Sequence, residues 1–175
     1  VLADAGDSFM CAGDLLMHEE TGFISQAFYC SIGFTLPAAL GVGLASPDHR
    51  PVVFIGDGAF QMVVQELSTL LRHHLNAVIF LMNNRGYTVE RVIHDGPYND
   101  LQNWRYHELV GIFGADAGWG CEVHNEGELE TALERASREF DRLAFIEVHL
   151  DPMDCSAALR RLGAELRRSN AIKES

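Results

Sequence analysis

Two apolar segments of strand length, each followed directly by polar and glycine residues, constrain the fold of this chain most strongly. The first runs from Val52 to Ile55 and is followed by Gly-Asp-Gly at 56–58. The second runs from Ala77 to Met82 and is followed by Asn-Asn-Arg-Gly at 83–86. Between them, apolar side chains recur at helical spacing, namely Val63, Leu67, Leu70 and Leu71. This order predicts strand, turn, helix, strand and turn, and an open parallel sheet brings both turns to its carboxyl edge, where ligands bind.

The two predicted turns carry side chains that suit a hard cation. Asp57 and Asn84 each follow a predicted strand, and their side-chain oxygens can converge with the backbone carbonyl of Gly86. Magnesium prefers such oxygen ligands and completes its shell with water and phosphate. Gly58 allows close approach of the backbone, and a helix beginning near Ala59 presents free N–H groups to an anion. The pattern predicts a Mg²⁺–diphosphate site, and the alternative is that both turns are ordinary loop residues.

The sequence around these turns resembles a known cofactor fingerprint. The order GDG, about two dozen residues, then NN is similar to the thiamine diphosphate (ThDP) motif. The continuation NNRGYTVERVIHDGPYNDLQNW resembles the 2-oxo acid decarboxylases, the group of pyruvate, indolepyruvate and phenylpyruvate decarboxylases. The likeness runs from about Leu2 to Leu150 and is most specific over residues 56–104. It corresponds to the family's C-terminal, diphosphate-binding domain, and the family's aminopyrimidine-binding and middle domains have no counterpart in this sequence.

The resemblance implies cofactor contacts in several segments. Family members place a diphosphate-binding turn near Asp7 and Ser8, often with a hydroxyl residue where Asp7 stands. A backbone carbonyl at the position of Cys30 takes the aminopyrimidine, and a large aliphatic residue at Ile32 wedges the cofactor into its bent form. The other implied cofactor residues lie in and after the two turns: Gly56, Gly58, Ala59, Gly86, Tyr87, Thr88 and Val89. From the residues alone, Asp7 and Ser8 are equally well explained as cap or turn residues, and Ile32 as a core residue.

Glu90 occupies the position that the resemblance gives to the family's catalytic carboxylate. A glutamate in a segment such as Tyr87–Ile93 is ordinarily a solvated helix residue, but the match of GYTVE to the family favours catalysis. We interpret His94 as a structural hydrogen-bonding residue. The pair at 73–74 ends the predicted central helix, where cations are favoured, and the family's catalytic His pair belongs to the missing aminopyrimidine domain.

The function implied by the resemblance is ThDP- and Mg²⁺-dependent, non-oxidative decarboxylation of a small-molecule 2-oxo acid to an aldehyde. This chain would supply the diphosphate and metal half of the site, and an aminopyrimidine-binding domain or subunit, in a homo- or hetero-oligomer, would supply the other half. One alternative is a carboligase of the acetolactate-synthase kind, which shares the metal motif. The other is a non-catalytic cofactor-binding module.

Composition narrows the classes of partner. With 47% apolar and 22% charged residues, the 175-residue chain has the balance of one globular domain, with residues 151–175 as a helical tail. The net charge of −12 argues against nucleic acid or an anionic membrane as a partner. Four cysteines without CxxC spacing fit reduced thiols in a cytoplasmic protein. The chain does not begin with Met, so a fragment of a longer enzyme is expected.

The overall expectation is an α/β fold, a doubly wound and mainly parallel sheet with helices on both faces. The predicted strands are Val1–Ala3, Phe23–Phe28, Val52–Ile55, Ala77–Met82, Gly120–His124 and Ala144–Leu150. Besides the central helix, helices are predicted at Phe34–Ala45, Tyr106–Phe113, Glu126–Phe140 and Asp154–Arg168. The helix at Glu126–Phe140 is expected to bury one face made of Leu129, Leu133 and Ala136. The polar segment Asp95–Trp104 is expected to form a loop over the site.

Overall fold

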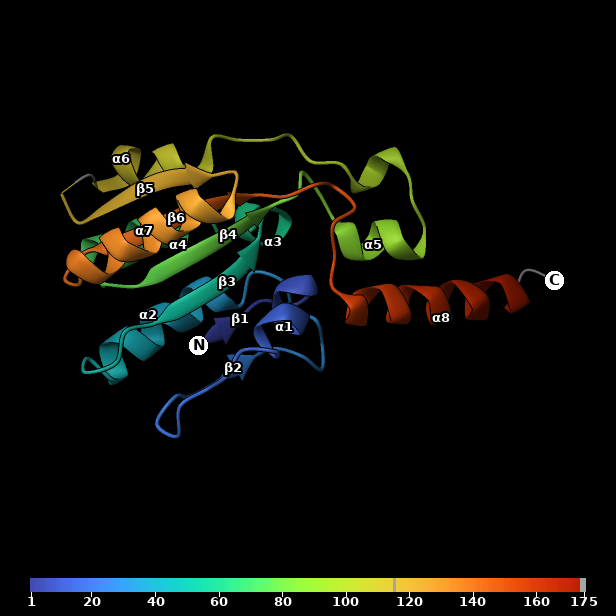
Figure 1. Ribbon diagram of the computed structural model, residues 1–175, viewed down its shortest axis with the longest axis horizontal. Coiled ribbons are helices and arrows are strands. Elements are labelled where there is room, and N and C mark those ends of the chain that lie inside the picture. Colours follow the sequence, from blue (N-terminus) through green and yellow to red (C-terminus); the bar gives the residue numbers. More distant parts are fainter. Residues whose placement is uncertain (115, 174–175) are drawn as a thin grey trace.

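The computed structural model describes residues 1–114 and 116–173, and a parallel sheet forms the centre of the molecule (Figure 1). In this part of the chain the sheet has six strands in the order β2-β1-β3-β4-β6-β5, and every neighbouring pair is parallel. The strands are β1 (Leu2–Ala3), β2 (Ile24–Ser25), β3 (Val52–Gly56), β4 (Val78–Asn83), β5 (Gly118–Val123) and β6 (Leu143–His149). The predicted α/β class and parallel arrangement are confirmed.

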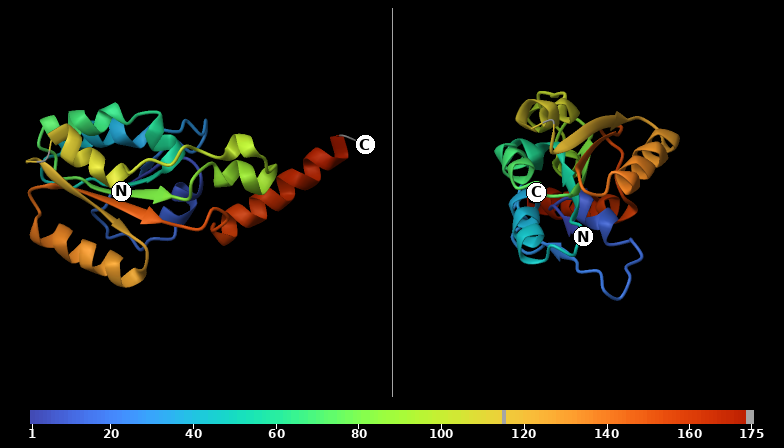
Figure 2. Two further views of the ribbon diagram at one scale, coloured as in Figure 1. Left: turned by 90° about the horizontal axis from the view of Figure 1, so that it is seen from above. Right: turned by 90° about the vertical axis from the view of Figure 1, so that its left-hand side faces the viewer.

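The connections between these strands are mostly helical, as parallel pairing requires. The α-helices are α1 (Asp7–Ala12), α2 (Thr35–Ala45), α3 (Asp57–Gln61), α4 (Gln65–Arg72), α5 (Thr88–Ile93), α6 (Leu109–Gly114), α7 (Glu126–Arg138) and α8 (Ala157–Lys173). Two short 3₁₀ helices are η1 (Pro97–Asn99) and η2 (Tyr106–Glu108). Helices α2, α4 and α6 cover one face of the sheet and α7 covers the opposite face (Figure 2). No helix in the described part of the chain has both the length and the apolarity needed to span a membrane.

The core is divided into two layers because the strands are buried on both faces. Alternate side chains of β3 and β4, such as Ile55 and Leu81, join Leu67 of α4 in the first layer. Their neighbours, such as Phe80, join Trp119 of β5 and Ala136 of α7 in the second layer. The near-continuous apolar runs noticed in the sequence therefore reflect burial on both sides, and they fix β3 and β4 at the centre of the sheet.

The predicted strand Phe23–Phe28 is wrong in extent, since only Ile24 and Ser25 pair with β1. Of its aromatic residues, Phe23 is 39% exposed and Phe28 is 96% exposed. An apolar run predicts a strand only when another layer covers it, and this one lies at the edge of the sheet. The remaining predicted strands agree with the observed ones to within about two residues.

Two helix predictions also need correction. The central helix is interrupted, because α3 ends at Gln61 and α4 starts at Gln65, so the helical segment begins at Asp57 and is not continuous. In α7, Ala132 and Ala136 are buried whereas Leu133 is 42% exposed. The buried face is therefore built on small residues that let α7 approach the sheet closely, and it is rotated from the predicted one.

Helix α8 lies apart from the sheet and packs on α5 (Figures 1 and 2). A Cβ on Gly163 of α8 would lie 2.9 Å from both the side chain and the carbonyl oxygen of Val92, so the two helices touch backbone to side chain at this point. Leu159 of α8 is fully buried. The predicted C-terminal tail is thus a supporting element for α5, the helix that follows the second turn.

Candidate cofactor and metal site

Strand register brings the two predicted turns to the same edge of the sheet. Gly56 at the end of β3 is the register partner of Met82 near the end of β4. The turns that follow are joined directly, because the Asp57 carboxylate accepts a hydrogen bond of 3.0 Å from the backbone N–H of Gly86. The two turns therefore lie next to each other at this edge, as expected from the sequence.

The carboxylate of Asp57 lies almost entirely out of solvent, at 1% exposure. Its other oxygen accepts a 2.7 Å hydrogen bond from the N–H of Gly58. Burial raises the pKa of Asp57 to about 6, although hydrogen bonds from Gly58 and Gly86 and the charge of Arg91 act in the opposite direction. Burial therefore destabilises the ionised carboxylate of Asp57, and a bound cation would offset this cost.

The second turn adds oxygen atoms of the kind that magnesium prefers. Asn84 is half-buried, and Gly86 has a φ of 150°, which disfavours other residues. A Cβ on Gly86 would overlap the carbonyl oxygen of Asn99 and the guanidinium of Arg91. The carbonyl of Gly86 accepts a 3.2 Å bond from Thr88 and keeps a second lone pair. The donor set of the two turns therefore fits Mg²⁺.

Tyr87 and Val89 connect the second turn to the rest of the edge. A Cβ on Gly58 would overlap the ring of Tyr87, so this glycine is required where the tyrosine lies across the start of α3. A Cβ on Gly6 would lie 3.3 Å from the side chain of Val89. The turns after β1, β3 and β4 thus meet through direct packing.

The turn after β1 is held by two carboxylates with different partners. Asp4 is buried and accepts hydrogen bonds from the N–H groups of Gly33 and Thr35 and from the Thr35 hydroxyl, at 2.8–3.1 Å. Asp7 begins α1 and accepts bonds from the N–H and the hydroxyl of Ser156. The Ser156 hydroxyl in turn accepts a 3.0 Å bond from the N–H of Leu159, which caps α8. This contact gives a structural reason for a carboxylate at position 7.

Of the remaining predicted cofactor residues, some lie in the site and some point elsewhere. Ser8 is buried in α1 and Ala59 is buried in α3. The hydroxyl of Thr88 donates a 2.9 Å bond to the carbonyl of Pro152, so its side chain faces the segment before α8. Cys30 is exposed with a φ of 49°, and Ile32 is half-buried against the first core layer.

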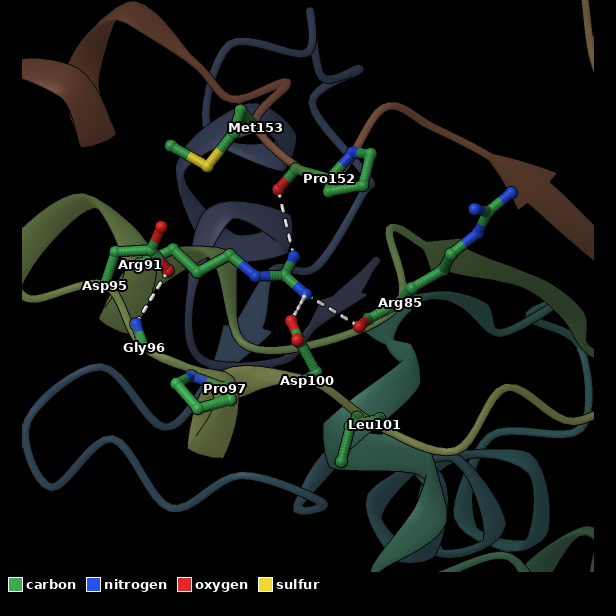
Figure 3. A pocket seen from close by; sticks show the side chains of 9 residues that line it. All are labelled: Arg85, Arg91, Asp95, Gly96, Pro97, Asp100, Leu101, Pro152 and Met153. Carbon is green, nitrogen blue, oxygen red and sulfur yellow. Dashed lines mark hydrogen bonds and ion pairs between the residues drawn. The ribbon is translucent and has the colours of Figure 1, made fainter.

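Glu90 lies in the first turn of α5 and its side chain is exposed. Its helix is fixed by the next residue, Arg91, whose buried guanidinium donates to four acceptors, three of which are drawn in Figure 3. These are the carbonyls of Asn84, Arg85 and Pro152 and the carboxylate of Asp100, at 2.7–3.0 Å. Arg91 and three of these partners, Arg85, Asp100 and Pro152, border a pocket of about 660 Å³ beside the second turn (Figure 3). Arg91 therefore ties the second turn, α5 and the segment before α8 to one another.

Several residues that organise this edge carry little or no signal in the sequence. Arg91 gave no signal, since a charged residue in a short helix is ordinarily solvated. Asp4 was signalled only by its place after a strand. Glu147 stands inside the apolar run of β6 and is 1% exposed, and that contrast was a usable signal. It accepts bonds of 2.6 Å from Asn83 and 2.7 Å from the ring of His107, so it fixes the end of β4 next to Asn84.

A parallel sheet with a buried carboxylate and amide oxygens gathered at its carboxyl edge defines a cofactor-binding α/β domain. The chain belongs to the thiamine pyrophosphate enzymes, since residues 4–148 match the family model "Thiamine pyrophosphate enzyme, C-terminal TPP binding domain". The identity of the domain expected from GDG and NN is thereby confirmed.

Comparison with individual proteins agrees with this assignment. The chain is 44% identical to an alpha-keto-acid decarboxylase of Mycolicibacterium paratuberculosis over 164 aligned residues. These residues make up 93% of this chain and 29% of that protein. It is 42% identical over 174 residues to pyruvate decarboxylase 1 of Arabidopsis thaliana, covering 98% of this chain and 29% of that protein. The chain thus spans less than a third of the length of these relatives.

Solved structures show the same fold. The benzoylformate decarboxylase of Polynucleobacter necessarius superimposes with a TM-score of 0.74 at 20% identity, over 89% of this chain and 30% of that one. A 4-hydroxybenzoylformate decarboxylase of Rhodococcus jostii superimposes with a TM-score of 0.65 at 27% identity, over 74% of this chain and 25% of that one.

Proposed function

We propose that this chain supplies the diphosphate- and magnesium-binding half of a ThDP-dependent enzyme that converts a 2-oxo acid to an aldehyde and CO₂ without oxidation. The observation that carries the proposal is the hydrogen bond between Asp57 and Gly86, which joins the two turns at the carboxyl edge. Sequence identity of about 43% to alpha-keto-acid and pyruvate decarboxylases supports the reaction class.

In this scheme the side chains of Asp57 and Asn84 and the carbonyl of Gly86 hold Mg²⁺. The start of α3 and of α1 would hold the diphosphate, and the proposed contacts are Gly56, Gly58, Ala59, Ser8 and Asp7, the last through its backbone because its carboxylate is bonded to Ser156. Residues of the 30–32 turn and the start of α5 would hold the organic part of the cofactor, and the proposed contacts are Cys30, Ile32, Tyr87, Thr88 and Val89. When bound, ThDP supplies the electron sink for decarboxylation.

Glu90 is proposed as the acid–base group of the reaction. It projects from the first turn of α5, directly after the residues assigned to the cofactor. Its exposure in this chain is consistent with a site that a second domain or subunit closes. A positioned carboxylate of this kind transfers protons to and from the reacting groups, and the bonds of Arg91 hold its helix in place.

The proposed partner is an aminopyrimidine-binding domain or subunit, in the same or another chain of an oligomer. The segment before α2 exposes large apolar side chains that a monomer ordinarily covers, with Leu16 at 100% and Phe28 at 96% exposure. This segment lies at the β2 end of the sheet and includes Cys30, which is assigned to the cofactor. A partner that covers it would complete the site on that side.

The substitution Glu90→Gln in the assembled enzyme tests this assignment. We expect kcat to fall about 10²–10⁴-fold, because an amide keeps the size of the side chain but carries no transferable proton. Affinity for ThDP should stay close to that of the parent, since Glu90 is not assigned to the metal. Glu126→Gln is the matched control, because Glu126 is also exposed in the first turn of a helix, α7, and lies away from the site.

Product analysis in the same assay separates the alternatives. Aldehyde as the main product supports a decarboxylase, whereas an acyloin or acetohydroxy acid indicates a carboligase. Turnover of Glu90→Gln within about threefold of the parent, against an expected loss of at least about 10²-fold, would remove Glu90 from the acid–base role. An assembled enzyme without turnover of any 2-oxo acid would indicate a cofactor-binding module.

A further inference from the structure

A second group of metal-ligating side chains lies at the β5 end of the same sheet edge, outside the site described above. Glu122, His124 and His149 each offer one ligand atom, and these atoms all lie within 4.8 Å of one another. We propose that these three residues form a binding site for a transition-metal ion of the Zn²⁺ type, separate from the magnesium site.

The group is a direct result of strand register. Val123 of β5 is the register partner of Val148 of β6, so His124 and His149 follow at the next step of neighbouring parallel strands. Side chains alternate along a strand, and His124, the first residue after β5, follows Glu122 by two positions. The two imidazole rings lie 4.3 Å apart between centroids with an interplanar angle of 14°. Glu122 and His149 are therefore held by the sheet, and His124 follows β5 at the start of the turn that leads to α7.

The distances suit one small ion between the three side chains. Zn–N and Zn–O bonds of about 2.0–2.2 Å in a tetrahedral site place neighbouring ligand atoms about 3.3–3.5 Å apart. One oxygen of Glu122 lies 3.1 Å from Nε2 of His149 and 3.7 Å from Nε2 of His124, which brackets that spacing. Because the lone pairs of two stacked rings do not point at the same ion, the exposed ring of His124 has to turn before both imidazoles can bind one metal.

The chemistry of the ligands selects the class of metal. Imidazole nitrogen is a ligand of zinc and related transition ions, whereas Mg²⁺ and Ca²⁺ take oxygen ligands. Two imidazoles and one carboxylate form a three-ligand set, and an exposed site leaves a fourth position for water. The buried carboxylate of Glu147 lies 3.5 Å from Nε2 of His149 and adds negative charge behind the site. The magnesium site, by contrast, is assigned oxygen ligands alone.

The site lies close to the second turn of the cofactor edge. His149 is the register partner of Asn83, and Glu147 binds Asn83 directly at 2.6 Å. Asn83 precedes Asn84, an assigned magnesium ligand. A metal ion held by His149 is therefore next to the residue pair that fixes the end of β4.

Zinc binding to the assembled enzyme, first saturated with Mg²⁺ and ThDP so that the magnesium site is filled, tests the proposal. Titration of this saturated enzyme with Zn²⁺ in a calorimeter should show one saturable site per chain. Co²⁺ in place of Zn²⁺ should give the absorption spectrum of a tetrahedral ion with nitrogen and oxygen ligands. The double variant His124→Ala/His149→Ala should lose this binding by at least about 100-fold, and Glu122→Gln by at least about tenfold, the scale reported for outer-shell partners.

The matched control is His18→Ala/His73→Ala, which removes two exposed imidazoles elsewhere on the chain and should bind Zn²⁺ like the parent. Circular dichroism of each variant separates loss of a ligand from loss of fold. Unchanged Zn²⁺ affinity in a folded His124→Ala/His149→Ala variant would overturn the proposal. So would a parent enzyme that takes up no Zn²⁺, in which case the three residues form an ordinary surface group of imidazoles and a carboxylate.

Discussion

The two halves of the candidate site are held in place by different means. Asp57 lies at the end of the central strand β3, is buried, and is fixed by amide hydrogen bonds within 30 residues of itself. Glu90 lies on the six-residue helix α5, is exposed, and depends on Pro152 and Gly163 for the position of its helix. The sheet therefore positions Asp57 in the metal half, whereas packing against the last helix positions Glu90 in the acid–base half.

Arg91 is the connection between these halves. It donates to the carbonyls of Asn84 and Arg85 on the metal side and to the carbonyl of Pro152 on the α8 side. A buried guanidinium is stable only when its donors are paired, and here most of its capacity is used. We therefore predict that a substitution can impair one half of the candidate site without the other, except at Arg91.

The largest effect is expected at the metal half alone. Asp57→Ala should lower Mg²⁺-dependent ThDP affinity by at least about 100-fold, the upper end of what outer-shell partners cost, because it removes a ligand itself. The fold should survive, since the substitution also removes a buried carboxylate. Calorimetry on the assembled enzyme measures it, with Asp48→Ala, an exposed aspartate before β3, as the control. Equal affinities in the two variants would contradict the metal assignment.

Loss of the connection should affect both halves. Arg91→Met is expected to lower the free energy of unfolding by about 2–4 kcal/mol, because buried carbonyls lose their donors. Both ThDP affinity and kcat should fall in the same variant. Urea denaturation gives the stability, and Arg105→Met is the control, because Arg105 is 80% exposed and its surface ion pair contributes little. If the two variants are equally stable, Arg91 is not the link.

The pH dependence of the metal-free chain isolates the metal half. Its folded state holds the Asp57 proton at a pKa of about 6, whereas the ordinary value is 3.8, so protonation favours the fold. This stability is fully present below about pH 4 and is lost as the pH rises through 6, an effect of about 3 kcal/mol. Unfolding experiments in EDTA should show the decline for the parent and a flatter profile for Asp57→Asn. Mg²⁺ with ThDP should restore stability above pH 6, and an unchanged slope in Asp57→Asn would count against this origin.

The smallest effect is expected at the contact between α5 and α8. Gly163→Ala gains about 1 kcal/mol of helix propensity, but its Cβ meets the Val92 carbonyl at 2.9 Å, and overpacking costs about 1–3 kcal/mol. Gly41→Ala in α2 has the same gain and nothing within 4 Å of its Cβ. Thermal unfolding should therefore place Gly163→Ala below Gly41→Ala by about 2 kcal/mol, with kcat affected only in the first. Equal melting temperatures would show that α8 shifts to accommodate the added methyl group without loss of stability.

The difference between the metal half and the acid–base half also explains which features could be predicted from the sequence. The central strands and their turns were predicted to within about two residues, because burial on both faces leaves a continuous apolar signal and parallel register then fixes the edge. The support of Glu90 could not be predicted, since the partners of Arg91 and Asp7 lie up to 149 positions away and no local pattern marks them. Phe23 and Phe28 misled the strand prediction, because apolar side chains at the β2 end remain exposed.

The contact between Asp7 and Ser156 has a consequence for the order in which the chain acquires its structure. These residues are 149 positions apart, whereas Asp57 and Gly86 are 29 apart. For a free chain, closing the longer loop costs about 1.4 kcal/mol more entropy. During synthesis the turns of β3 and β4 can therefore meet while Ser156 is not yet made. The nascent protein therefore brings Asp57 and Gly86 together early and acquires the support for Glu90 last.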